Sequence, residues 1–240
     1  MNTSYLSRLN IFIAAVFAAQ LLLILAPPIG APAVAALLGA TVLFAMRSAE
    51  LSSIMLSLAI LLASELAGLV TGGSVSIGPV VVQYAVIYGL GLFYWLRFEP
   101  HRHHPRPVSF HLLYLPVMIV IGISLGYLGF LERGSIPLIP AVKTPLLLYI
   151  PFFALAEELL FRRMILHEVS RHAGIAAGVV ASVWLSMTFQ ASTDLTALGF
   201  VILSSFAIST IYAVERNLFY PVVINIVMKY TFVILLIKMG

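Results

Sequence analysis

The sequence has no cysteine and little charge. Among its 240 residues, Asp, Glu, Lys and Arg together account for only 9%. The lack of cysteine excludes disulfides, thiol catalysis and cysteine metal ligands. The lack of charge excludes an ordinary soluble domain, because 62% of the residues are hydrophobic and the mean hydropathy is +1.09. The net charge of +4 does not indicate nucleic-acid binding, since the basic residues are scattered through short loops.

Long apolar segments fill most of the chain. We count nine of them, at 9–26, 31–46, 51–71, 76–96, 110–130, 145–168, 173–192, 195–213 and 217–237. The second is short and rich in Ala and Gly, which is compatible with either a tilted span or a re-entrant segment. The pattern therefore predicts an all-α integral membrane bundle of eight or nine transmembrane helices. We expect a single membrane domain over 1–240, with N-terminal spans in 1–130 and a core in 145–237.

The basic residues predict the orientation. With nine spans, the loops on one side carry nine arginines, counting Arg162 and Arg163, and those on the other carry three basic residues. The positive-inside rule then places the N-terminus in the cytoplasm. We expect a multi-pass protein of the inner or plasma membrane. The apolar run after Arg8 is interpreted as the first membrane helix and not as a signal peptide, because no small-x-small cleavage site precedes Pro27.

Charged residues interrupt the sixth apolar segment. Glu157, Glu158, Arg162 and Arg163 follow a run that is too short to span a bilayer alone, since a span needs about 20 residues. The helix must therefore continue through these charges toward His167. Ionisable residues inside a membrane are expensive and mark a functional site by default.

Helical spacing separates the two glutamates. Glu158 and Arg162 are four residues apart, in the favourable order for an ion pair on one face. Glu157 points about 100° away and shares its face with Phe161 and Met164. One carboxylate is thus neutralised locally, and the other is left to act as a base toward water.

Partners for the glutamates must come from other spans. The ninth segment offers Asn225 and Lys229, which share a helical face. A buried lysine is as costly as a buried glutamate, so we expect Lys229 to face the glutamates. The seventh segment offers Ser186, Thr188 and Gln190 near its end.

Other polar residues have simpler interpretations. Glu65, Gln20 and Gln83 are expected to form interhelical hydrogen bonds. The loop 101–107 contains three histidines and invites a metal site, but its two prolines favour a basic loop that touches anionic lipid.

The pattern Glu157-Glu158-x-x-x-Arg162 in a membrane helix resembles the first motif of the CPBP (Abi) family, which includes the type II CAAX prenyl endopeptidases. The resemblance covers roughly 145–235. It implies Glu157 as the base that activates water and Glu158 with Arg162 as an orienting pair. By position it also implies Gln190 and Asn225 as oxyanion donors, with Lys229 at the position of a family asparagine.

The later family motifs carry histidines that this chain lacks. Gln190 and Asn225 stand where the family has histidine, and no histidine occurs after His172. A register shifted by two residues would use Trp184 and Thr188 for the second motif instead. Lys229 would also make a cluster of two glutamates and two basic residues neutral, which is typical of a closed ion-pair network.

The leading hypothesis is an intramembrane glutamic-type endopeptidase that acts on a membrane-associated peptide or protein precursor. The alternatives are a catalytically inactive scaffold or immunity protein of the same kind, and a small transporter that uses Glu65, Glu157 and Lys229 as a relay. No cofactor or metal is expected, and the expected partners are membrane lipid and a peptide or membrane-protein substrate. The oligomeric state is left open.

Overall fold

The chain folds into a bundle of helices. The computed structural model describes residues 3–48, 51–71, 78–98, 114–133, 140–190 and 195–239. The helices are α1 (Thr3–Leu25), α2 (Pro27–Arg47), α3 (Ser52–Thr71), α4 (Gly78–Phe98), α5 (Leu115–Arg133), α6 (Pro140–Glu158), η2 (Leu159–Leu166), α7 (His167–Ala173), α8 (Ile175–Gln190), α9 (Leu195–Glu215) and α10 (Phe219–Met239). The described residues contain no strand, so the all-α prediction is confirmed.

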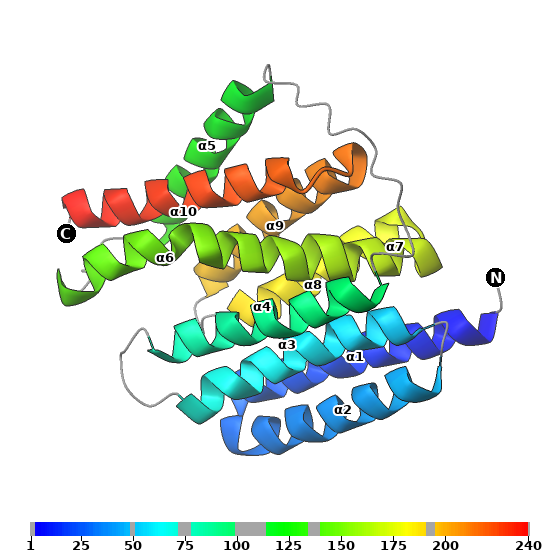
Figure 1. The fold of residues 1–240 in the computed structure, drawn as a ribbon. Helices are drawn as coiled ribbons and strands as arrows, with labels where there is room; N and C mark the ends of the chain where they lie inside the picture. The colour runs from blue at the N-terminus through cyan, green and yellow to red at the C-terminus, as the bar shows by residue number, and fades with distance from the viewer. Residues whose placement is uncertain are drawn as a thin grey trace.

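Most helices run side by side along one direction, and α5 crosses them obliquely (Figure 1). The two chain ends lie at opposite ends of the bundle. Each predicted apolar segment corresponds to one helical rod of the described chain, with α6, η2 and α7 forming a single continuous rod. The charged segment therefore lies inside a long helix, as predicted.

Several helices have the length and composition of membrane spans. Within the described residues, four meet both requirements, namely Pro27–Arg47, Ser52–Leu69, Leu198–Glu215 and Phe219–Lys238. Shorter apolar helices lie at Leu9–Leu25, Val80–Tyr94, Leu115–Leu131 and Ile175–Phe189. An all-α membrane bundle is thus confirmed, and eight or nine spans remains a prediction.

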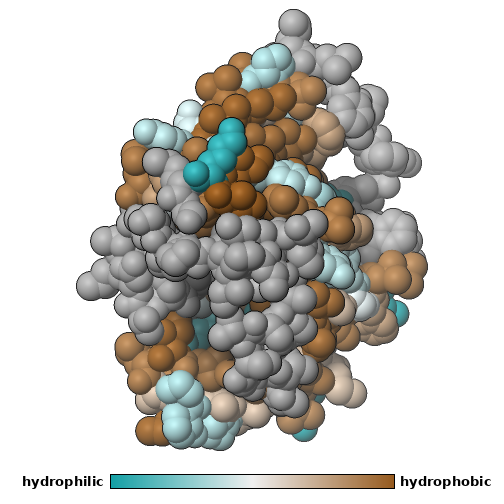
Figure 2. All heavy atoms as spheres, turned by 90° about the vertical axis from the view of Figure 1, so that its left-hand side faces the viewer, coloured by the Kyte–Doolittle hydropathy of each residue, from teal (hydrophilic) through white to brown (hydrophobic). Residues whose placement is uncertain are grey.

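The outer surface is rich in large apolar side chains. Leu25, Met46 and Val214 are 77%, 80% and 73% exposed, which is typical of side chains that face lipid. Figure 2 shows the face at the left of Figure 1, where hydrophobic residues cover most of the described surface.

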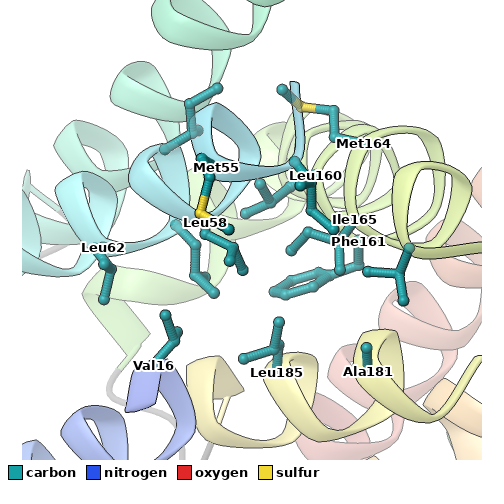
Figure 3. Close-up of a cluster of buried hydrophobic side chains, with 14 of the residues drawn as sticks. Val16, Met55, Leu58, Leu62, Leu160, Phe161, Met164, Ile165, Ala181 and Leu185 are labelled. Carbon is teal, nitrogen blue, oxygen red and sulfur yellow. The ribbon is translucent and has the colours of Figure 1, made fainter. Parts of the chain in front are cut away.

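The largest hydrophobic cluster joins the N-terminal spans to the charged helix. Its buried members come from α1, α2, α3, α4, α6, η2, α7 and α8. In Figure 3, Val16 of α1, Leu58 of α3 and Leu185 of α8 surround the side chains of η2. Phe161 and Leu160 are both fully buried there. The rod that carries the glutamates is therefore held on several sides by apolar packing.

The charged rod changes its helical form immediately after Glu158. Residues Leu159–Leu166 form a π-helix, and the amide of His167 donates to the carbonyl of Arg162, five residues back. Six of these eight residues are buried. A π-helical turn within an α-helix is rare and frequently marks a functional site. The sequence does not predict it.

Two glycines bring α5 against α10. A Cβ added to Gly122 would lie 2.8 Å from the side chain of Val227, and one added to Gly126 would lie 2.5 Å from the carbonyl of Met228. Small residues four apart allow membrane helices to approach closely. This contact sets the position of α10, which carries Asn225 and Lys229.

Candidate active site

Glu157 lies at the meeting point of three helices. Its side chain is 1% exposed, and its Oε1 atom lies 3.0 Å from the Nζ atom of Lys229 on α10. The hydroxyl of Tyr84 on α4 donates to the same oxygen. The Nδ2 atom of Asn225 donates to Oε2 at 3.1 Å. The expectation that Lys229 faces the glutamates is confirmed.

Glu158 belongs to the same cluster but faces a different cation. Its Oε2 atom lies 3.2 Å from the Nε atom of Arg162, and both side chains are at most 2% exposed. The two groups are not aligned for a hydrogen bond, so the contact is an ion pair. The predicted Glu158–Arg162 pair is confirmed.

Asn225 connects the two carboxylates. Its Nδ2 atom donates to Oε1 of Glu158 at 2.6 Å as well as to Glu157. An amide nitrogen has two hydrogens, so both are used by the glutamates in this arrangement. Arg162 in turn donates through Nη2 to the backbone carbonyl of Ser205 on α9 at 3.3 Å. The cluster therefore ties α6, η2, α9 and α10 together.

The cluster is electrically balanced. Two carboxylates and two basic side chains sum to zero formal charge, and each carboxylate has its own cation. Burying unpaired charges would cost several kcal/mol each, so this pairing is what makes the buried cluster tolerable.

A cavity distinguishes Glu157 from Glu158. It has a volume of about 270 Å³, and Glu157, Lys229 and Tyr84 line it together with apolar side chains such as Phe189. Glu158 does not line it. A small molecule or a peptide group in this cavity would therefore contact Glu157 and Lys229. Glu158 and Arg162 do not line the cavity and lie next to this pair in the same cluster.

The polar residues of α8 that the sequence offers as partners for the glutamates have different surroundings. Gln190 is the last residue of α8, and its side chain lies outside the described residues. Ser186 is buried and donates to the Oγ atom of Ser205 at 2.8 Å. In the register shifted by two residues, Thr188 donates to Gln20 on α1 and Trp184 is 50% exposed, so neither contacts the glutamates.

Glu65 and Gln20 form the expected interhelical hydrogen bond. The Nε2 atom of Gln20 on α1 donates to Oε1 of Glu65 on α3. Both side chains are buried. Gln83, for which we expect the same kind of bond, lines the cavity of about 270 Å³ and a neighbouring one of about 240 Å³.

The sequence contains no signal for the contacts of two buried glutamates, Glu157 with Tyr84 and Glu168 with Ser53 and Tyr94. Tyr84 sits in an apolar helix with other tyrosines, and only its position opposite Glu157 reveals its role. Glu168 is 1% exposed and accepts from Ser53 at 2.6 Å and from Tyr94 at 2.9 Å. The Nη1 atom of Arg171, whose side chain is 46% exposed, lies 3.4 Å from the Oε2 atom of Glu168.

Among the described residues, no three side chains of His, Cys, Asp or Glu lie together to hold a metal ion. The histidine-containing loop 101–107 lies outside them.

Comparison with known protein families supports the resemblance. Residues 139–231 match the family model described as Rce1-like, type II CAAX prenyl endopeptidase Rce1-like. The match begins just before α6 and ends within α10, so it contains the whole ion-pair cluster. No curated protein and no solved structure matched the chain.

The fold and the buried cluster thus define an α-helical membrane protein whose C-terminal part is similar to CAAX proteases. The similarity extends over residues 139–231.

Proposed function

We propose that the protein is an intramembrane endopeptidase that cleaves a membrane-associated peptide at the Glu157 cavity. The observation that carries this proposal is the asymmetry of the two glutamates. Glu157 lines a cavity of about 270 Å³ with a lysine beside it, while Glu158 is paired behind it with Arg162.

The reaction uses Glu157 as a general base. Its carboxylate accepts a proton from a water molecule, and the oxygen of that water forms a bond to the carbonyl carbon of the peptide. The C–N bond then breaks as the same proton passes to the leaving nitrogen. Lys229 stabilises the negative oxygen that develops in between, because its ammonium group lines the cavity beside the base.

Asn225 and Glu158 act on Glu157 indirectly. Both N–H groups of the Asn225 amide donate to the glutamates, so it holds their carboxylates in place. An oxyanion would have to draw one of these hydrogens away. Gln190, which stands at a histidine position of the family pattern, is the further donor. Tyr84 orients Glu157 from α4.

Cleavage of a membrane-bound reporter tests this proposal. Full-length protein in vesicles is mixed with a fluorogenic peptide that ends in a prenylated CAAX sequence, the substrate class in the name of the matching family. We expect cleavage by the wild type, loss of at least a hundredfold in Glu157→Gln, and near wild-type rates in Glu168→Gln. Glu168 is a matched control because it is an equally buried carboxylate outside the cavity.

A non-catalytic scaffold is the second candidate, and the closed network favours it. Tyr84, Lys229 and Asn225 all contact Glu157, and the histidines of the family pattern are absent. Under this reading neither the prenylated peptide nor its unprenylated form is cleaved. Glu157→Gln would then lower the thermal stability without changing any activity.

A further inference from the structure

A second cavity adjoins the one that contains Glu157. It has a volume of about 240 Å³ and shares Val80, Gln83 and Phe189 with the first. The ends of α1 and α3 supply most of its remaining wall. These helices lie outside the segment that matches the family model.

Glu65 is the acidic residue of this second cavity. Its side chain is 8% exposed, and its Oε1 atom accepts a hydrogen bond from Gln20. Its Oε2 atom is buried and has no hydrogen-bond partner among the described residues. Gln20 is held in turn by Thr188, which donates to its carbonyl oxygen. This chain of hydrogen bonds fixes the carboxylate and leaves one oxygen unused.

Glu65 also differs from the other buried glutamates in its charge environment. Glu157, Glu158 and Glu168 each have a lysine or an arginine within 3.4 Å. No such pair is formed by Glu65 within the described chain, and no basic residue lines its cavity. A buried carboxylate is stable only where a cation and hydrogen-bond donors reach it, so this site is complementary to a group that supplies both.

We propose that the Glu65 cavity binds the ammonium or guanidinium group of a basic side chain on the peptide whose backbone reaches Glu157. That this side chain belongs to a peptide held at Glu157 rests on the proposed function. The binding of a basic group at Glu65 does not. The apolar walls formed by Leu23, Ile24 and Leu69 accommodate the methylene stem of such a side chain. The volume is below the roughly 300–1,000 Å³ of ordinary small-molecule pockets and fits one side chain.

Binding of two matched probes to the purified full-length protein in detergent tests the proposal without any turnover. N-acetyl-lysine-methylamide carries the charge, and N-acetyl-norleucine-methylamide has a similar stem without it. We expect the lysine probe to raise the melting temperature of the wild type with increasing concentration, and the norleucine probe to have little effect.

Three single substitutions locate the effect. Glu65→Gln keeps the size of the side chain and should weaken the apparent affinity for the lysine probe roughly tenfold or more. Glu157→Gln and Glu168→Gln should both keep the wild-type response. The proposal is overturned if Glu65→Gln responds like the wild type, if the norleucine probe acts equally well, or if Glu157→Gln abolishes the response.

A fourth variant leaves Glu65 in place. A Cβ on Gly68 would lie 3.5 Å from the Gln83 side chain, so Gly68→Ala is accommodated and Gly68→Leu extends into the cavity. Loss of the response in Gly68→Leu but not in Gly68→Ala supports the proposal even where Glu65→Gln folds poorly. An unchanged response in Gly68→Leu refutes it. If the reporter peptide is never cleaved but the probe response holds, only the peptidase function fails.

Discussion

Lys229 and Glu157 form the contact that joins the middle of α10 to the end of α6, with 3.0 Å between Nζ and Oε1. The side chain of Lys229 is the more exposed of the two, at 25% against 1% for Glu157. Removing the lysine therefore leaves a deeply buried carboxylate without its cation.

Lys229→Met should lower the free energy of unfolding by about 1–3 kcal/mol, somewhat less than for a fully buried pair because the lysine reaches the cavity. The double variant Glu157→Gln/Lys229→Met should recover a large part of the loss, since no charge is then left alone. Unfolding in mixed micelles measures this cycle. Strictly additive losses would show that the two groups do not interact.

Arg162 should matter more for stability than its neighbour Arg163. Arg162 is 2% exposed, pairs with Glu158 and donates to the Ser205 carbonyl. Arg162→Met should cost about 3–5 kcal/mol because it strands a buried charge. Arg163→Met, one position along the same π-helix and only partly buried, is the control. Equal costs for the two variants would contradict the buried ion pair.

The contact between α5 and α10 should tolerate no added side chain at Gly126. Its Cβ would meet the Met228 carbonyl at 2.5 Å, so Gly126→Ala should lower stability by about 1–3 kcal/mol and shift Lys229 with α10. Gly89→Ala is the matched control, since no atom outside the backbone of its own helix lies within 4 Å of an added Cβ. Thermal unfolding of both variants measures the difference, and a stable Gly126→Ala would mean that the helices are less tightly apposed.

The orientation remains a prediction that the absence of cysteine makes easy to test. With a cytoplasmic N-terminus, α1 crosses outward and α2 returns, so Pro28 and Ser48 lie on opposite sides of the membrane. A membrane-impermeant maleimide added to intact cells should label Pro28→Cys and not Ser48→Cys. The reverse pattern would invert the whole topology.

The helices could be predicted because their signal is long and local. Every predicted apolar segment became a helical rod, and the charged segment continued as a helix toward His167. The ends differ by a few residues, as at 110–130 against Leu115–Arg133. What local patterns could not supply was the change to π-helical form after Glu158, because it depends on how η2 packs among its neighbours.

The site could be predicted where helical spacing constrains it. The spacing of Glu158 and Arg162, and that of Asn225 and Lys229, placed each pair on one face. The cost of a buried charge then brought Lys229 to Glu157.

Residues on helices far along the chain could not be found this way. Tyr84 and Ser53 have ordinary positions in apolar helices, and their roles arise only where tertiary packing brings a carboxylate to them. Glu168 follows the first glutamates so closely in sequence that it reads as the end of the same charged run, although its partners come from α3 and α4.

The π-helix gives the charged rod some tolerance in its length. A π-helical turn holds about one residue more than an α-helical turn, so Leu159–Leu166 contain an extra residue. Deleting one residue there would let an ordinary α-helix form and would leave Glu168 at nearly its present angle beside Ser53 and Tyr94. The same deletion in an ordinary α-helix turns everything after it by about 100°. A single lost codon should therefore do less damage in this segment than in the neighbouring helices.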